Sequence, residues 1–87
     1  MNDETLLVFP CEFPIKMMGH NTPEFVATAR ALVEIHTGPL DDSRFQNALS
    51  RHERFVSVTA TISAQSQRQL DDIYRDLSAH KSVLMAL

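Results

Sequence analysis

The sequence of 87 residues has one cysteine, two glycines and a small excess of acidic charge. The single Cys11 cannot close a disulfide bond within the chain. A net charge of −3 gives no positive field that would draw the protein to nucleic acid or to an anionic membrane. No apolar run approaches the roughly 20 residues that span a bilayer, and no secretory signal pattern opens the chain. We therefore expect a cytoplasmic protein without a membrane helix, for which nucleic acid is a disfavoured partner.

The chain is too short for two hydrophobic cores, since each half would fall below the size at which domains usually fold unaided. Hydrophobic residues make up 44% of it and charged residues 22%, which is the composition of a packed globular domain. A domain of this size cannot easily enclose a substrate cavity of roughly 300–1,000 Å³. We predict one domain over residues 1–87, with residues 1–10 as an N-terminal arm that lies on it.

The first half of the chain shows the patterns of one strand and one helix. Residues 12–19 alternate with a period of two, which predicts a strand with a clear inner face. Residues 23–37 repeat apolar side chains at helical spacing, between a proline that suits a helix start and Gly38, which suits a helix end. Arg30 and Glu34 lie outside the apolar stripe at i, i+4 and predict an ion pair.

Two more strands are predicted in the middle of the chain. Residues 44–51 alternate weakly, and Asn47 falls among their apolar positions, which is typical of an edge strand. Residues 55–64 show the best alternation in the sequence, with apolar side chains facing one way and mostly Ser and Thr facing the other. The second of these strands should therefore have one buried face and one polar face.

The last part of the chain predicts a helix and a closing strand. Ser66 and Gln69 have the spacing of a capping box, in which each side chain satisfies a backbone donor of the other, before a helix that runs to about Ala79. Residues 82–87 alternate again, with Val83, Met85 and Leu87 facing the core and Leu84 facing away. The complete order predicts an α+β fold, a ferredoxin-like βαββαβ plait, whose four-stranded antiparallel sheet has the order 4132 and both helices on one face.

A set of residues runs in a characteristic order through these elements, namely Phe9-Pro10, Phe13, Lys16, Met18-Gly19, Pro23-Glu24, Ser57-Val58, Tyr74, Leu77, Val83, Met85 and Leu87. By this set the chain resembles the YbeD-like family of small bacterial proteins of unknown function. The resemblance implies a fold similar to the ACT regulatory domains that bind amino acids, and a regulatory role linked to lipoate metabolism. It supplies no catalytic residues, and it does not account for His20-Asn21 or for the arginine-rich segment 51–54.

The loop between the first predicted strand and helix is the candidate ligand site. Unbonded N–H groups and the dipole at a helix N-terminus favour a carboxylate or a phosphate. In ACT-like domains the corresponding loop often lines an effector site. The alternative is that Gly19 only makes the turn, that Asn21 or Thr22 caps the helix, and that His20 is solvated. The candidate ligand-binding residues are Gly19, His20, Asn21 and Thr22.

The face of the predicted sheet that carries no helix is a second candidate surface. Its side chains are too apolar for an ideal solvated face and too polar for a core, so a partner chain could cover them. The alternative is an ordinary sheet face exposed to water. The residues expected there are Lys16, Met18, Ser57, Thr59, Thr61 and Leu84.

Binding of RNA or of single-stranded nucleic acid is the alternative function. Ribonucleoprotein-type domains share this strand order, but they stack bases on aromatic side chains of the central strands, where this sequence has Ser and Thr. The remaining route is a phosphate contact at a basic hairpin. The residues expected to cluster there are Arg44, Arg51, His52 and Arg54.

Metal, cofactor and catalytic motifs are missing from the sequence. The histidines His20, His36, His52 and His80 lie in different predicted elements, without the i, i+4 spacing of ligands on one helix. We therefore predict no enzyme, no metal and no cofactor. The function we expect is that of a non-catalytic, ACT-like regulatory or adaptor domain that binds a small metabolite or a protein partner, with a homodimer through the sheet edges or the open face as one form of such binding.

Overall fold

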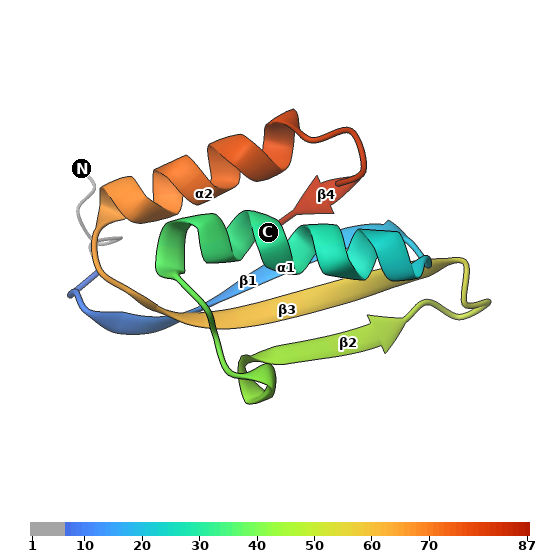
Figure 1. The fold of residues 1–87 in the computed structure, drawn as a ribbon, viewed down its shortest axis with the longest axis horizontal. Helices are drawn as coiled ribbons and strands as arrows, with labels where there is room; N and C mark the ends of the chain where they lie inside the picture. Colours follow the sequence, from blue (N-terminus) through green and yellow to red (C-terminus); the bar gives the residue numbers. More distant parts are fainter. Residues whose placement is uncertain (1–6) are drawn as a thin grey trace.

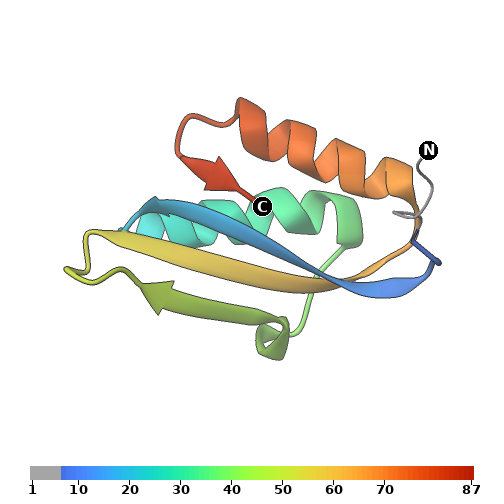
Figure 2. The same ribbon diagram turned by 180° about the vertical axis from the view of Figure 1, so that it is seen from behind.

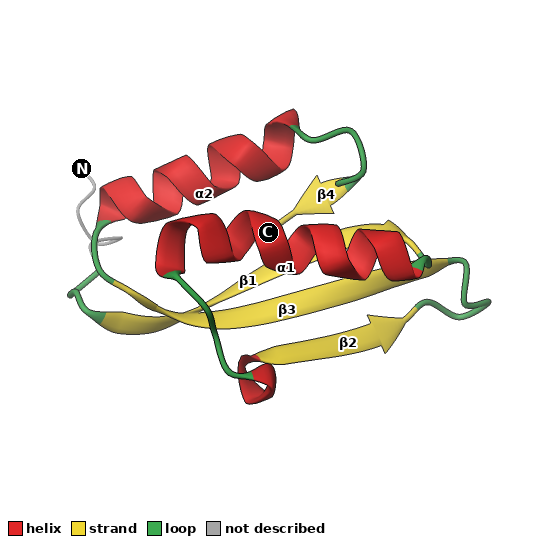
Figure 3. Cartoon of the chain, in the orientation of Figure 1, coloured by secondary structure: helices red, strands yellow, loops and turns green. Residues whose placement is uncertain are grey.

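The computed structural model describes residues 7–87, in which a sheet and two helices form two layers (Figure 1, Figure 3). The antiparallel sheet has the order β2-β3-β1-β4, and Figure 2 shows its second face, which no helix of residues 7–87 covers. The predicted ferredoxin-like plait is confirmed, because this is the order 4132 seen from the other edge. The elements are β1 (Cys11–His20), α1 (Pro23–Thr37), the short 3-10 helix η2 (Asp42–Arg44), β2 (Phe45–Leu49), β3 (Phe55–Ala64), α2 (Gln67–Ala79) and β4 (Met85–Ala86).

The core lies between the central strands and the two helices. β1 and β3 pair from Cys11 opposite Ala64 to His20 opposite Phe55. In this register the apolar residues of one strand lie opposite those of the other, and both sets face the helices. Residues 1–6 of the predicted N-terminal arm lie outside the described residues, and residues 7–10 contain neither helix nor strand. The buried core residues are Ile15, Met17, Phe25, Ala29, Val33, Val56, Val58, Ala60, Ile62, Ala64, Leu70, Ile73 and Leu77.

Side chains and glycines fix the position of α1 on the sheet. The Oγ1 atom of Thr22 accepts the N–H of Phe25 at 3.0 Å and caps the helix. Gly38, with φ 79°, ends it and donates its N–H to the carbonyl of Glu34 at 2.9 Å. Gly19 does not make the predicted turn. It lies within β1 opposite Val56, and the ring of Phe25 occupies the space where a side chain would stand.

β2 is shorter than the predicted strand over residues 44–51. The side chain of Asp41 accepts the N–H of Ser43 at 3.0 Å, and its carbonyl accepts the N–H of Arg44 at 2.9 Å, so Arg44 ends the 3-10 turn η2. At the other end, Ser50 begins the turn into β3. The expected edge position is confirmed, since β3 is the only strand of residues 7–87 that borders this one.

β4 differs most from its prediction. It contains only Met85 and Ala86, and its two faces are exchanged, because Ala86 lies opposite the buried Met17 while Met85 lies opposite Met18. Met85 and Leu87 are therefore not core residues, with exposed fractions of 50% and 66%. Apolar residues fill both faces of this segment, so its alternation could not decide which face is inside.

Polar bonds join the ends of the two helices. Ser66 caps α2 by accepting the N–H of Gln69 at 3.1 Å, as predicted. The side chain of Gln69 accepts the N–H of Gln65 at 2.8 Å, one residue before the donor that a capping box uses. It also donates to the carbonyl of His36 in α1 at 3.0 Å, and His36 Nε2 lies 2.6 Å from Asp76 Oδ2 in α2. These contacts hold α1 and α2 together on the outside of the core.

Candidate functional site

The β1–α1 loop and the β2–β3 hairpin meet at one end of the molecule. The side chain of Asn21 donates to the carbonyl of Glu53 at 2.9 Å, and its backbone N–H donates to the carbonyl of Arg54 at 3.0 Å. The ring of His20 lies 5.2 Å from the ring of Phe55, centroid to centroid. Two segments that are far apart in the sequence therefore form one surface. We call it the hairpin surface; its residues are His20, Asn21, Ser50, Arg51, His52, Arg54 and Phe55.

The hairpin has a tight and partly strained backbone. Glu53 donates its N–H to the carbonyl of Ser50 at 2.8 Å, and Ser50 Oγ accepts the N–H of Phe55 at 3.0 Å. Glu53 has φ 58°, a left-handed conformation that costs an ordinary residue about 1–2 kcal/mol. The contact between Asn21 and the carbonyl of Glu53 holds this conformation from the neighbouring loop.

The hairpin surface contains a hollow with basic side chains and one aromatic wall. The hollow measures about 280 Å³ and is lined by Ser50, Arg51, His52, Arg54 and Phe55. Among the described residues, Arg51 and Arg54 form no ion pair, whereas Arg30, Arg44 and Arg75 each pair with an acidic side chain. Two guanidinium groups are thus available to an anion from outside the chain, because their donors suit carboxylate and phosphate oxygens.

The predicted basic cluster is only partly present. Arg44 lies at the opposite end of β2 from the hairpin and bonds to Glu12. The prediction that Arg44 joins Arg51 and Arg54 is therefore wrong, because a strand separates them. The structure instead adds His20 and Phe55 to the basic hairpin. Sequence reasoning missed this neighbourhood, since no local pattern relates residue 20 to residue 55.

The four residues of the predicted ligand loop have different positions. Thr22 is occupied by helix capping and Gly19 by the approach of Phe25. His20 and Asn21 are exposed and border the hairpin. Only these two therefore have side chains placed to meet a ligand, and Asn21 already donates to the hairpin backbone.

The helix-free sheet face brings together most residues of the second candidate surface. Lys16 lies opposite Thr59 and Met18 opposite Ser57 in the β1–β3 register. Thr61 lies on the same face, opposite Pro14. Leu84 lies outside β4, and Met85 takes the expected place beside Met18.

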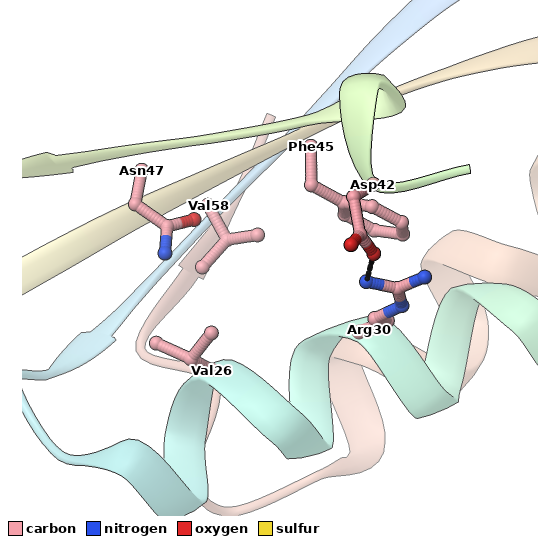
Figure 4. A pocket seen from close by; sticks show the side chains of 6 residues that line it. All are labelled: Val26, Arg30, Asp42, Phe45, Asn47 and Val58. Carbon is pink, nitrogen blue, oxygen red and sulfur yellow. Dashed lines mark hydrogen bonds and ion pairs between the residues drawn. The ribbon is translucent and has the colours of Figure 1, made fainter. Parts of the chain in front are cut away.

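A second concavity, which the sequence did not predict, lies between α1 and the edge strand β2 (Figure 4). Arg30 borders it and is fully engaged: Nη1 bonds Asp42 at 2.7 Å, Nη2 bonds the carbonyl of Leu40 at 2.7 Å, and Nε bonds Glu34 at 3.2 Å. The Asp42 bond, followed by that to Glu34, raises the pKa of Arg30. We call this concavity of about 290 Å³ the β2 groove; it is lined by Val26, Arg30, Asp42, Phe45, Asn47 and Val58.

Within residues 7–87, no three or more His, Cys, Asp and Glu side chains are grouped so that they could hold a metal ion. Neither helix among these residues has the length and apolar character needed to cross a bilayer.

The two-layer arrangement defines a small α+β domain of ferredoxin-like fold, and a solved structure shares it. The solution structure of protein HP0495 from H. pylori superposes with a TM-score of 0.65 over 100% of this chain and 94% of that one, at 19% identity. The chain belongs to the DUF493 family of proteins of unknown function, whose model matches residues 4–87. A UPF0250 protein of Paraburkholderia phytofirmans is 41% identical over 85 residues, covering 98% of this chain and 96% of the relative. The UPF0250 protein NE1487 of Nitrosomonas europaea is 37% identical over 87 residues, covering both chains fully.

Proposed function

We propose that the protein is a non-catalytic regulatory domain of the cytoplasm that binds a small anionic metabolite at the hairpin surface. The observation that carries the proposal is the pair Arg51 and Arg54, which line a hollow and form no ion pair among the described residues. Phe55 gives the hollow an apolar wall. A carboxylate or phosphate with a short apolar part is the chemistry that such a hollow accepts.

Two features of the hairpin favour the binding of an anion. The guanidinium groups of Arg51 and Arg54 would donate hydrogen bonds to a ligand anion. The ring of His20 lies beside the ring of Phe55. The hydrogen bonds from Asn21 hold the loop and hairpin in one arrangement before a ligand arrives, which lowers the ordering cost of binding. The similarity to regulatory ACT domains is an argument from fold alone and agrees with this role.

The proposal is tested by a thermal-shift screen of the purified protein. The compounds are amino acids, short acyl and lipoyl acids, nucleotides and a short RNA. A ligand at about 100 times its dissociation constant adds roughly 2.7 kcal/mol to a protein's stability, so binding will raise the melting temperature measurably. We expect one class of anionic metabolites to produce a reproducible rise.

Variants locate the site. Arg54→Ala should weaken the binding of the compound found in the screen by about tenfold or more, because a hydrogen bond to a charged group contributes roughly 1.5–3 kcal/mol. Arg68→Ala is the control, since Arg68 lies in α2, is exposed and forms no ion pair with the described residues. A flat screen, or equal losses in the two variants, would contradict the proposal.

Nucleic acid is a distinct outcome of the same screen. If the short RNA alone stabilises the protein, binding should fall steeply with salt and be lost in the double variant Arg51→Glu plus Arg54→Glu. The separation of Arg44 from this hairpin removes one of the three arginines on which that alternative depended. Binding of RNA without binding of metabolites would replace the proposed ligand class.

A protein partner on the helix-free sheet face is the second candidate function. Met85 and Leu87 are each at least half exposed, and Met85 lies opposite Met18 on this face. The test is affinity capture with the immobilised protein, repeated with Lys16→Glu and with the control Lys81→Glu. A partner retained by the wild type and the control, and lost by Lys16→Glu, would support an adaptor role. Equal retention by both variants would contradict it.

A further inference from the structure

The outer edge of β2, at the lower border of the sheet in Figure 1, presents backbone groups that no strand of the described residues pairs with. Ser50 donates its N–H to the carbonyl of Phe55, and the register continues along both strands. Hydrogen-bonded pairs alternate in an antiparallel ladder, so the backbone groups of Asn47 and Leu49 point away from β3. This edge can therefore pair with another strand.

The side chains of Asn47 and Leu49 lie on the helix side of the sheet. The described residues leave both of them partly uncovered. Leu49 lies opposite the buried Val56, yet its side chain is 52% exposed. Asn47 lines the β2 groove next to Val58 and forms no side-chain hydrogen bond with the described residues (Figure 4). Within the described chain, β2 thus has backbone groups without partners along its outer edge, and its side chains on the helix side are incompletely covered.

We infer that two copies of this chain pair antiparallel through the edge of β2, on a two-fold axis at Asn47. In this register Phe45 of each copy lies opposite Leu49 of the other, so an apolar side chain meets an apolar one twice. The two Asn47 amides meet on the axis, where each can donate to and accept from the other. The inference does not rest on the proposed metabolite binding.

The charges on either side of β2 match the same axis. Asp41 and Asp42 lie in the turn before the strand, and Arg51 and His52 lie in the hairpin after it. Antiparallel pairing about Asn47 brings the turn before β2 of one copy to the same end of the paired strands as the hairpin after β2 of the other. Asp42 bonds Arg30 through Oδ1, but its side chain is 91% exposed and can meet a second cation, and Arg51 forms no ion pair within the described chain. A second copy therefore supplies complementary charge at both ends of the paired strands.

β4, the other edge, offers no comparable match. It contains two residues, so it provides a shorter ladder than the five residues of β2. Pairing at β2 also places the second copy along the open side of the β2 groove. The apolar wall of the groove, formed by Val26, Phe45 and Val58, then becomes part of a shared interior.

The test is sedimentation of the full chain over a range of concentrations, at low and high salt. We expect a reversible dimer that weakens as salt rises, because the end charges are exposed and screened. Leu49→Lys should weaken association at least about tenfold, since it places a charge in an apolar pairing. Ile35→Lys is the matched control, because Ile35 is also exposed, at 69%, but lies on α1.

A second variant keeps the result independent of the Leu49 side chain. Asn47→Pro removes an N–H that points away from β3, and proline is tolerated where an edge strand faces solvent. It should abolish the dimer while circular dichroism and cooperative unfolding remain those of the folded chain. A chain that stays monomeric up to about 1 mM would overturn the inference. So would a dimer that neither Leu49→Lys nor Asn47→Pro weakens, since its interface would lie elsewhere.

Discussion

At the position of Gly19, β1 has no room for a side chain, because the ring of Phe25 lies against the backbone. Phe25 is only 3% exposed and packs within the core, so it cannot move aside freely. We expect Gly19→Ala to lower the free energy of unfolding by about 1–3 kcal/mol, the usual cost of overpacking. Denaturant titration measures this change.

A double variant separates crowding from other effects at this position. Phe25→Leu removes ring atoms, so Gly19→Ala should cost less in its presence than in the wild type. The two substitutions are thus expected to couple favourably. Additive losses would contradict a direct clash between residues 19 and 25.

Thr22 serves the helix rather than a ligand. Its Oγ1 accepts the N–H of Phe25, one of the helix donors that have no carbonyl partner. Thr22→Ala should cost about 1 kcal/mol of stability, and Thr22→Ser, which keeps the oxygen, should cost far less. Thermal or chemical unfolding of both variants measures the difference, and equal losses would argue against capping.

At the scale of elements, sequence patterns succeeded where one side of a segment is clearly polar. The predicted boundaries of β3 and α1 agree with the structure, because Ser and Thr mark the outer face of β3 and Gly38 marks the end of α1. The segment from Val83 to Leu87 has no polar residue on either face, so alternation gave the wrong inner face for β4. Tertiary pairing with Met17 and Met18, rather than local pattern, decides its orientation.

Tyr74, in α2, forms a hydrogen bond that anchors the residue after β4. Its hydroxyl donates to the carbonyl of Leu87 at 2.8 Å, and burial raises the pKa of Tyr74 above its usual value near 10. A raised pKa in the folded state means that the neutral form is the stabilising one. This contribution is therefore present in full below about pH 10 and is lost as pH rises through the pKa of the folded state.

Tyr74→Phe tests this contact. Near neutral pH the variant should be less stable than the wild type by about 0.5–1.5 kcal/mol, the usual net contribution of a hydrogen bond. Urea unfolding at about pH 8 and about pH 11 should show this difference shrinking at the higher pH, where the phenol ionises. A difference that stays constant with pH would contradict the assignment.

For the whole molecule, the sequence predicts the fold, but it predicts the candidate site only in part. Both His20-Asn21 and the arginines of segment 51–54 were recognised as unusual, but as separate features. The contact between Asn21 and Glu53 joins positions that are 32 residues apart, which only the assembled sheet brings together. The error about Arg44 has a different cause, because the strand predicted over residues 44–51 already separates Arg44 from Arg51 by its own length.

The distribution of stability over the whole sheet follows from its pairing. β1 and β3 pair along their full ten-residue lengths at the centre, whereas β4 holds β1 through two residues and the backbone bonds from Leu84 and Leu87. Segments with few contacts open locally at lower free energy than the core. We expect the amides of Leu84 and Leu87 to exchange with solvent at least about tenfold faster than those paired between β1 and β3.

Amide hydrogen exchange followed by NMR measures this difference residue by residue. If exchange between β1 and β3 occurs only through complete unfolding, its free energy should equal that from urea titration, while β4 should give a smaller value. Tyr74→Phe should accelerate exchange at Leu87 and leave the central strands changed only by the loss in global stability. Equal protection of β4 and the centre would instead mean that the two-residue strand unfolds only with the whole domain. The short pairing and the exposed Met85 and Leu87 favour local opening.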